Sequence, residues 1–459
     1  MSTLLGQSDS RILNSEEDLA SYFQGFSKPL QKVRIGLEAE FFAVERQTGR
    51  ALPYEGALSV HAILKELKAR FAYEPVLESG NIIALKRGEW IISLEPGGQM
   101  ELSAPPVANV FEIEKQLKRF FGELLSLNDR FPEAAWLAVG MQPFTALDEI
   151  TWVPKKRYQL MKDYLGTRGT MSHEMMKRTA TNQICLDYTS EENAMAGLRL
   201  TLGITSIVSA MFAHSPFSDG RPNGFLTRRL DIWNHTSPER AGLIVQFTRP
   251  GMAFRDYLEY LLEMPLMFIV RRDQWIPVQD FNFRRFIGKG YLGHKATIAD
   301  FDLHLSTAFP EVRLKQYLEI RGADCQRPDL IPALAAFWKG ILYDNTAREK
   351  AWQLVAFASE EERLALHQSV PRQGLKAKLG GQPVMPIARE LVDIACASLA
   401  QQNAKPAMPS ECIYLERLMN EIIIPEKSPA ETLLEKWKHE WKGDRAQFIE
   451  TLRIKPDES

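Results

Sequence analysis

The chain has 459 residues, of which 45% are hydrophobic and 25% are charged, enough apolar material for a large globular core. Lysines and arginines total 56 against 58 aspartates and glutamates, so the formal net charge is −2. A near-neutral chain has no general attraction for nucleic acid or anionic lipid, which argues against both as partners.

The predicted elements of the first third alternate between strands and helices, since apolar residues recur first every second position and then at helical spacing. Arg87-Gly88 suits a hairpin turn, and Pro96-Gly97-Gly98 interrupts the pattern. In chain order we predict a helix over 15–30, a strand over 35–44, a helix over 58–71, strands over 81–86, 89–95 and 99–103, and a long helix over 110–127.

The remaining two thirds predict further strands and then mostly helices. Strands are expected at 135–141 and 181–188, and helices at 335–343, 347–359, 361–368, 388–400 and 430–439. This order favours an α+β fold, a mainly antiparallel sheet covered by helices, over alternating βαβ units. We predict a helical lead-in over 1–30, a catalytic sheet region over 31–331 and a helical region over 332–459 packed on the same catalytic domain.

The four cysteines, Cys185, Cys325, Cys396 and Cys412, are far apart and form no C-x-x-C pair. This spacing argues against a zinc ribbon and a disulfide scaffold, so we expect reduced thiols in the cytoplasm. Residues 1–20 contain no apolar stretch suited to a signal peptide. The longest uncharged run, 200–213, is shorter than the roughly 20 residues that span a bilayer. It predicts a buried helix, and we expect no membrane contact.

Five glutamates lie in settings that suggest chemistry. Glu38 and Glu40 are two apart on a predicted strand and so leave the same face, although exposed strands often present acids to water. Glu95 and Glu101 flank the Pro-Gly-Gly bend, and Glu319 lies in another alternating stretch. If these carboxylates meet, their repulsion requires a divalent cation, and an all-oxygen cluster suits Mg²⁺, or Mn²⁺, rather than zinc.

Arg321 lies two residues from Glu319 and would place a phosphate-binding cation beside a metal-binding anion, as phosphoryl transfer requires. A single arginine is more often a solvated surface charge. Residues 288–293 match G-x-G-x-x-G, but no helical apolar pattern follows them. We therefore interpret this match as a surface turn and not as a dinucleotide loop.

Several motifs resemble the glutamate–cysteine ligase family of plant and proteobacterial type. The resemblance covers about residues 30 to 441, in order and without large gaps. The motifs are Gly36-Leu-Glu-Ala-Glu40, Ser93-Leu-Glu-Pro-Gly-Gly-Gln-Met-Glu-Leu-Ser103, Pro154-Lys-Lys-Arg-Tyr158, His214-Ser-Pro-Phe-Ser-Asp-Gly-Arg-Pro-Asn-Gly224, Phe309-Pro-Glu-Val-Arg-Leu-Lys315 and Tyr317-Leu-Glu-Ile-Arg-Gly-Ala-Asp324.

The resemblance implies a glutamine-synthetase-like antiparallel sheet curved into a funnel, and a ligase. ATP would phosphorylate the γ-carboxyl of glutamate, and the cysteine amine would then displace phosphate to give γ-glutamylcysteine, the first step of glutathione biosynthesis. The family's residues map as follows: metal ligands Glu38, Glu40, Glu95, Glu101, Glu319 and Gln183; glutamate-binding Arg229; phosphate-binding Arg321; and pocket-lining Arg157, Tyr158, Arg178 and Thr181.

Cys185 departs from the family pattern, which usually has Asn there. We interpret it as a small buried thiol, with oxidation sensitivity as the alternative. The cysteine pairs that form a redox switch in plant members have no counterparts, and no plastid-type leader is recognised. We therefore expect a cytoplasmic enzyme without that regulation, either a monomer or a homodimer.

Two other functions stay open at this point. One is a related glutamate or carboxylate–amine ligase that uses a different amine acceptor, because the metal and ATP residues would be shared. The other is a non-catalytic protein on the same scaffold.

Overall fold

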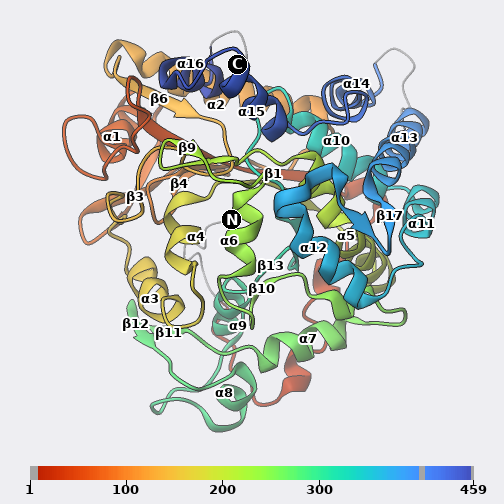
Figure 1. The fold of residues 1–459 in the computed structure, drawn as a ribbon. Helices are drawn as coiled ribbons and strands as arrows, with labels where there is room; N and C mark the ends of the chain where they lie inside the picture. The colour runs from red at the N-terminus through yellow and green to blue at the C-terminus, as the bar shows by residue number, and fades with distance from the viewer. Residues whose placement is uncertain (1–8, 403–408, 456–459) are drawn as a thin grey trace.

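The main element of the fold is an open antiparallel sheet, seen in the computed structural model, which describes residues 9–402 and 409–455 (Figure 1). Within these residues the sheet has nine strands. Eight of them pair in the order β14-β15-β7-β1-β5-β4-β3-β2, and the ninth, β6, pairs with the end of β1. The strands are β1 Ile35–Glu45, β2 Glu74–Glu78, β3 Asn81–Arg87, β4 Trp90–Leu94, β5 Met100–Ser103, β6 Ala134–Leu137, β7 Asn182–Leu186, β14 Val312–Leu314 and β15 Leu318–Ile320.

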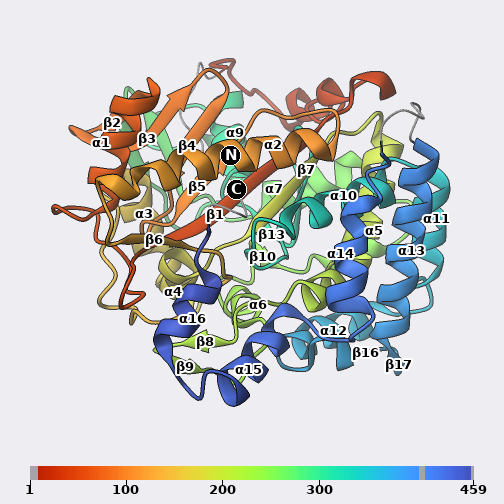
Figure 2. The same cartoon turned by 90° about the horizontal axis from the view of Figure 1, so that it is seen from above.

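Helices cover this sheet, which confirms the predicted α+β class. Figure 2 shows α2 beside β1, and α10, α11, α13 and α14 on the side away from the β2–β3 hairpin. The helices are α1 Val60–Phe71, α2 Val110–Leu125, α3 Lys156–Leu165, α4 Ser172–Arg178, α5 Glu191–Met211, α6 Arg228–Asn234, α7 Phe254–Glu263, α8 Phe283–Lys289, α9 Ile298–Leu305, α10 Ile331–Leu342, α11 Asn345–Gln353, α12 Glu360–Gln373, α13 Val384–Gln402, α14 Ile413–Leu418, α15 Pro429–His439 and α16 Arg445–Leu452.

Alternation along β1 separates the core from the site. Leu37, Ala39 and Phe41 face one side of the sheet, where Phe41 packs edge-on against Phe121 of α2 with ring centroids 5.0 Å apart. Glu38 and Glu40 therefore face the other side. The helix α2 stays in place because Asn109 caps its first turn, accepting a hydrogen bond from the Glu112 amide. One layer of the fold is thus apolar core, and the opposite face is left for polar side chains.

Four short hairpins or bridged pairs lie outside the main sheet and were not predicted. They are β8 Phe217–Ser218 with β9 Arg221–Pro222, β10 Ala241–Gly242 with β13 Phe309–Pro310, β11 Phe268–Arg271 with β12 Gln274–Pro277, and β16 Lys378–Leu379 with β17 Gln382–Pro383. The G-x-G-x-x-G match begins in the last two residues of α8 and continues beyond it, and the end of the helix is marked by Gly290 at φ 68°. A dinucleotide loop would open a helix, so the interpretation as a turn agrees with this position.

The predicted helix over 15–30 is wrong. The chain forms three 3₁₀ turns there, Glu16–Leu19, Gln24–Phe26 and Leu30–Lys32, because Pro29 and the extended Ser27 prevent a continuous α-helix. The predicted lead-in begins at residue 1, and residues 1–8 lie outside the described residues, as do 456–459 of the predicted C-terminal region. The three-part division of the chain stays a prediction.

Residues 200–211 of the uncharged run 200–213 lie in α5, as predicted for a buried helix, and its last two residues follow the end of that helix. Among the described residues α5 alone is long and apolar enough to cross a membrane, and 89% of its apolar window is buried against the rest of the protein. Core helices have this composition when they are covered on all sides.

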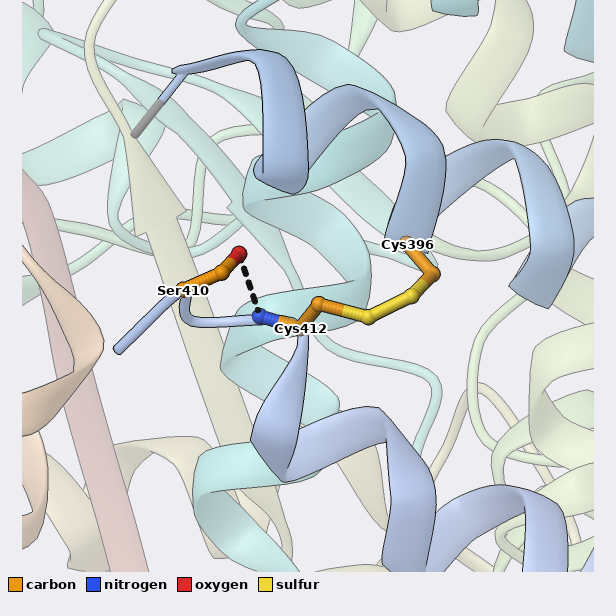
Figure 3. The surroundings of a disulfide bond; sticks show 3 residues. All are labelled: Cys396, Ser410 and Cys412. Atoms are coloured by element: carbon orange, nitrogen blue, oxygen red, sulfur yellow. Dashed lines mark hydrogen bonds between the residues drawn. A yellow bond between two sulfur atoms is a disulfide. The ribbon is translucent and has the colours of Figure 1, made fainter. Parts of the chain in front are cut away.

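The expectation of four reduced cysteines is wrong for two of them. Cys396 of α13 and Cys412, at the start of α14, form a disulfide, with their Cα atoms 4.8 Å apart (Figure 3). Cys185 and Cys325 are free and buried. Sixteen positions separate the bonded pair in sequence, and only the return of the chain from α13 to α14 brings the two thiols together.

Candidate active site

Strand register places the predicted carboxylates on one face of the sheet. Glu40 on β1 lies opposite Glu101 on β5, which in turn lies opposite Ser93 on β4. On the other side of β1, Glu38 lies opposite Gln183 of β7. The next strands extend the row, because Cys185 lies opposite Glu319 and Glu319 lies opposite Arg313 of β14. Antiparallel neighbours share a face, so acidic and basic side chains from distant segments converge.

All but two of the predicted site residues line one cavity on this face. The cavity-lining set is Glu38, Glu40, Glu95, Glu101, Arg157, Tyr158, Thr181, Gln183, Arg229 and Arg321. Glu319 lies just behind the cavity wall and contacts Arg321. The second residue outside the lining is Arg178, whose guanidinium binds Glu174 at 3.2 Å and Asp219 at 2.9 Å.

The acidic side of the cavity holds Glu40, Glu95 and Glu101. Burial, followed by repulsion from Glu101, raises the pKa of Glu40 to about 7 and raises the pKa of Glu95 well above its ordinary value. Burial also opposes ionisation of Glu101, yet its pKa is lowered, with hydrogen bonds from Glu95, Ser103 and Ser93 among the causes. The serine hydroxyls donate to the Glu101 carboxylate at 2.8 and 3.1 Å. The ionisation of one of these carboxylates therefore disfavours the ionisation of the others, and a proton or cation between them relieves the repulsion.

This donor set fits a hard divalent cation. The groups are carboxylate oxygens of Glu101, which is buried, and of Glu40 and Glu95, which are half-buried, and the Gln183 amide nitrogen lies 3.5 Å from Glu40. Mg²⁺ and Mn²⁺ prefer such oxygen ligands. A cation beside Glu40 and Glu95 would favour their ionised forms and so oppose the rise in their pKa values.

The basic side of the site is organised around Glu319. Arg313 binds this carboxylate through Nε at 2.6 Å and Nη2 at 2.5 Å, Arg321 binds it at 3.1 Å, and Lys315 lies 3.4 Å away. Although burial opposes ionisation, Arg313, Lys315 and Arg321 hold the pKa of Glu319 well below its usual range. Arg321 also donates to the side-chain amide oxygen Oε1 of Gln183 at 2.6 Å, so its guanidinium is fixed between the acidic and basic sides.

Two more arginines, Arg229 and Arg157, line the cavity. Arg229 of α6 donates to the carbonyls of Arg321 at 2.9 Å and Gly322 at 3.3 Å, and Arg157 of α3 donates to that of Ser306 at 3.1 Å. Within the described part of the chain, Arg229 Nε and Arg157 Nη1 are buried and have no hydrogen-bond acceptor. Burial lowers the pKa of Arg157 to about 10, which keeps it cationic at neutral pH. Each has a donor left for an anion.

Tyr158 and Thr181 hold the cavity walls together. The Tyr158 hydroxyl donates to the Leu94 carbonyl oxygen at 2.7 Å, one residue before Glu95. The Thr181 hydroxyl donates to the Ala323 carbonyl oxygen at 2.6 Å, and its amide donates to Glu40 at 3.0 Å. Both side chains thus fix the backbone next to a charged group, while their outer surfaces line the cavity.

Sequence reasoning missed Arg313, Lys155 and several apolar lining residues. The first two lie in motifs quoted above, but nothing in the sequence showed that Arg313 pairs with Glu319 or that the Lys155 ammonium stacks on the Tyr158 ring at 4.7 Å. The alternation Val312-Arg313-Leu314 opposite Leu318-Glu319-Ile320 was the available signal. The apolar lining residues include Met161, Met175, Met176, Trp233 and Phe309.

Comparisons with known proteins agree along the whole chain. The model of "Glutamate-cysteine ligase family 2" matches residues 34–450. The chloroplastic glutamate–cysteine ligase of Nicotiana tabacum is 35% identical over 431 residues, covering 93% of this chain and 80% of that protein. The chloroplastic glutamate–cysteine ligase B of Oryza sativa subsp. japonica is 35% identical over 430 residues, covering 93% and 85%.

Solved structures share the fold at low sequence identity. The crystal structure of glutamate–cysteine ligase from Francisella tularensis, in complex with AMP, superimposes with a TM-score of 0.58 at 11% identity, covering 92% of this chain and 87% of that one. That of a bifunctional glutathione synthetase from Pasteurella multocida gives 0.50 at 13% identity, covering 96% and 54%. Both likenesses concern the fold alone.

The cytoplasmic location predicted from the sequence is contradicted. The relatives from Nicotiana, Oryza and Arabidopsis are named chloroplastic, and this finding overturns the prediction. The prediction failed because cysteine spacing and the search for an apolar signal segment report on secretion, and they do not discriminate between compartments inside the cell.

Proposed function

Because this chain belongs to glutamate–cysteine ligase family 2, we propose that it joins the γ-carboxyl of glutamate to the amine of cysteine in an ATP-dependent ligation. The product is γ-glutamylcysteine, the first intermediate of glutathione synthesis. The observation that carries this function is the meeting of buried carboxylates and arginines in one cavity, at the positions that the family's motifs predict. Such a cavity suits phosphoryl transfer, in which charge must be positioned and neutralised.

Glu38, Glu40, Glu95, Glu101, Glu319 and Gln183 are the residues proposed to hold Mg²⁺. Metal coordination requires ionised carboxylates. Five of these side chains lie on strands of the sheet, and Glu95 lies directly after β4. When bound, the cation offsets repulsion between the carboxylate of glutamate and the phosphates of ATP.

The arginines are proposed to hold the anionic groups of the substrates. Arg229 would bind the glutamate carboxylate through its unpaired Nε, and Arg157, which lines the same cavity, would assist it. Arg321, fixed by Gln183 and Glu319, would bind the phosphoryl group as negative charge grows on its oxygens. Transfer of the γ-phosphoryl group of ATP to the γ-carboxylate of glutamate forms the acyl phosphate and releases ADP. Attack by the amine then forms the amide bond, breaks the bond from carbon to the phosphate oxygen and releases phosphate, while the proton of the amine passes to solvent.

Product identification by mass spectrometry tests the proposal. The protein is incubated with ATP, Mg²⁺, glutamate and cysteine, and the expected products are γ-glutamylcysteine, ADP and phosphate. The same reaction with 2-aminobutyrate and other amines, followed by ADP release, measures the acceptor preference. Failure with cysteine and turnover with another amine would favour the related amine ligase.

Two substitutions connect the activity to the cavity. Glu40→Gln and Arg321→Ala are each expected to reduce kcat by several powers of ten, on the order of 10³-fold for a group that stabilises transition-state charge, while the circular dichroism spectrum stays unchanged. Arg50→Ala is the control, since Arg50 forms an exposed pair with Glu149. Equal activity of Arg321→Ala and Arg50→Ala would contradict the assigned role.

A further inference from the structure

Cys185 adds a sulfur atom to the site. Glu38, Cys185 and Glu319 each offer one ligand atom, and these atoms all lie within 4.8 Å of one another. All three side chains are buried, with 5%, 9% and 0% of their surface exposed. A carboxylate–thiol–carboxylate group of this size matches the three-ligand arrangement of many metal sites, in which a fourth position stays open.

The sheet fixes this grouping. Cys185 lies directly opposite Glu319, and on the other side of β7 it lies opposite Gly36 of β1. A Cβ atom on Gly36 would be 3.3 Å from the Cys185 Cβ, so the missing side chain leaves the thiol room beside Glu38. The three ligands therefore come from adjacent strands and not from flexible loops.

We propose that Glu38, Cys185 and Glu319 bind a thiophilic divalent cation, with Zn²⁺ or Co²⁺ preferred over Mg²⁺. Thiolate ligands select such ions, whereas Mg²⁺ requires oxygen ligands in octahedral geometry. The inference rests on the proposed function in one respect: two of its ligands are assigned to the metal site of the ligase. Cys185 changes the metal preference of that part of the site, while Glu40, Glu95 and Glu101 remain an all-oxygen group.

The cations around Glu319 leave it able to take part. Arg313 and Arg321 both bind Oε2, whereas Lys315 contacts Oε1 at 3.4 Å. An ion at Oε1 and the Cys185 sulfur would displace only this long contact. As the metal–sulfur bond forms, the Sγ–H bond breaks and the proton passes to solvent.

Co²⁺ titration without nucleotide tests the site. The wild-type protein is expected to develop the near-ultraviolet sulfur-to-cobalt charge-transfer absorption, and Cys185→Ser and Cys185→Ala are expected to lack it. Cys325→Ala is the matched control, because Cys325 is also a free buried thiol. The double variant Cys396→Ser/Cys412→Ser excludes the two remaining cysteines as the source of the absorption. Both controls should keep the absorption.

Zn²⁺ affinity is measured by equilibrium dialysis on the same proteins. Cys185→Ser should bind Zn²⁺ at least tenfold more weakly, with little change for Mg²⁺. The inference is overturned if the wild-type protein shows no charge-transfer absorption, or if the Cys185 variants keep it. Ligation assayed with Mg²⁺ separates the two proposals: intact ligation without the absorption rejects only the sulfur site, and the absorption without ligation rejects only the ligase.

Discussion

Gly97 lies in the bend that joins Glu95 to Glu101, against the C-terminal half of α4. A Cβ atom added to it would be 2.4 Å from the carbonyl oxygen of Lys177, closer than atoms approach. The obstructing atom belongs to the backbone of a helix, so it cannot move aside cheaply. The bend therefore depends on glycine to keep two carboxylates in the cavity.

Gly97→Ala is expected to displace the bend and reduce activity at least tenfold, since a misplacement of about 1 Å can cost 100-fold. Gly122→Ala is the control, because Gly122 lies within α2 and a Cβ there meets nothing within 4 Å. That variant should be more stable by about 0.5–1 kcal/mol, since alanine favours helix. Steady-state kinetics measure the activity of both variants, and urea unfolding measures their stability. Unchanged activity in Gly97→Ala would show that the bend tolerates the shift.

Arg313 neutralises a carboxylate that has no access to water. Arg313→Met would leave Glu319 with Lys315 and Arg321 alone, and removing one partner of a buried pair costs about 3–5 kcal/mol. We expect the free energy of unfolding to fall by an amount near the lower end of this range, because two cations still contact Glu319. Arg50→Met, which breaks an exposed pair, should cost less than about 1 kcal/mol. Equal losses of unfolding free energy in the two variants would contradict the structural role of Arg313.

At the scale of elements, the disulfide ties the end of α13 to the start of α14. Next to it, Glu411 pairs with Lys339 of α10, and α10 contacts β7, the strand that carries Gln183 and Cys185. The segment between the two cysteines includes residues 403–408, which lie outside the described residues. Linking its ends restricts the unfolded chain more than the folded one.

A disulfide that closes a loop of this length contributes about 3 kcal/mol by the chain-entropy estimate. Reduction of the wild-type protein should lower its unfolding free energy by about that amount, and Cys396→Ser/Cys412→Ser should lower it equally and remove the sensitivity to reductant. Urea unfolding with and without a phosphine reductant measures this. A wild-type curve that ignores the reductant would show that the bond contributes nothing.

At the scale of the whole molecule, buried histidines determine part of the response to acid. Burial lowers the pKa of His214 to about 4 and of His304 to about 3, from an ordinary value of 6.5. Both stay neutral in the folded protein, while the unfolded chain takes up protons below pH 6.5. Stability is therefore lost as the pH falls from 6.5 toward 4.

At pH 5 each histidine is expected to lower the free energy of unfolding by about 2 kcal/mol relative to pH 7.5, since one pKa unit corresponds to about 1.4 kcal/mol. His304→Gln can keep the hydrogen bond to the Leu261 carbonyl oxygen and cannot titrate. Its loss of stability between pH 7.5 and 5 should be about 2 kcal/mol smaller than that of the wild type. Identical losses in guanidinium unfolding would show that His304 does not control this range.

The regular elements and the members of the site could largely be predicted. Alternation predicted β1, β3, β4 and β5 to within a few residues, because a half-buried strand must place apolar residues every second position. The region before β1 could not be predicted, since its apolar residues suit a helix while Pro29 breaks one. The assigned roles of the site residues stay predictions.

The sequence by itself determined the α+β class, the face on which Glu38 and Glu40 lie, and the family, because alternation and motif order are properties of the chain alone. Only the tertiary structure decided which side chains meet. It paired Arg313 with Glu319, turned Arg178 toward Glu174 and Asp219, set Cys185 beside two carboxylates and joined Cys396 to Cys412. The physical reason is that periodicity defines the side to which a residue points, whereas its neighbours depend on the register between strands far apart in the chain.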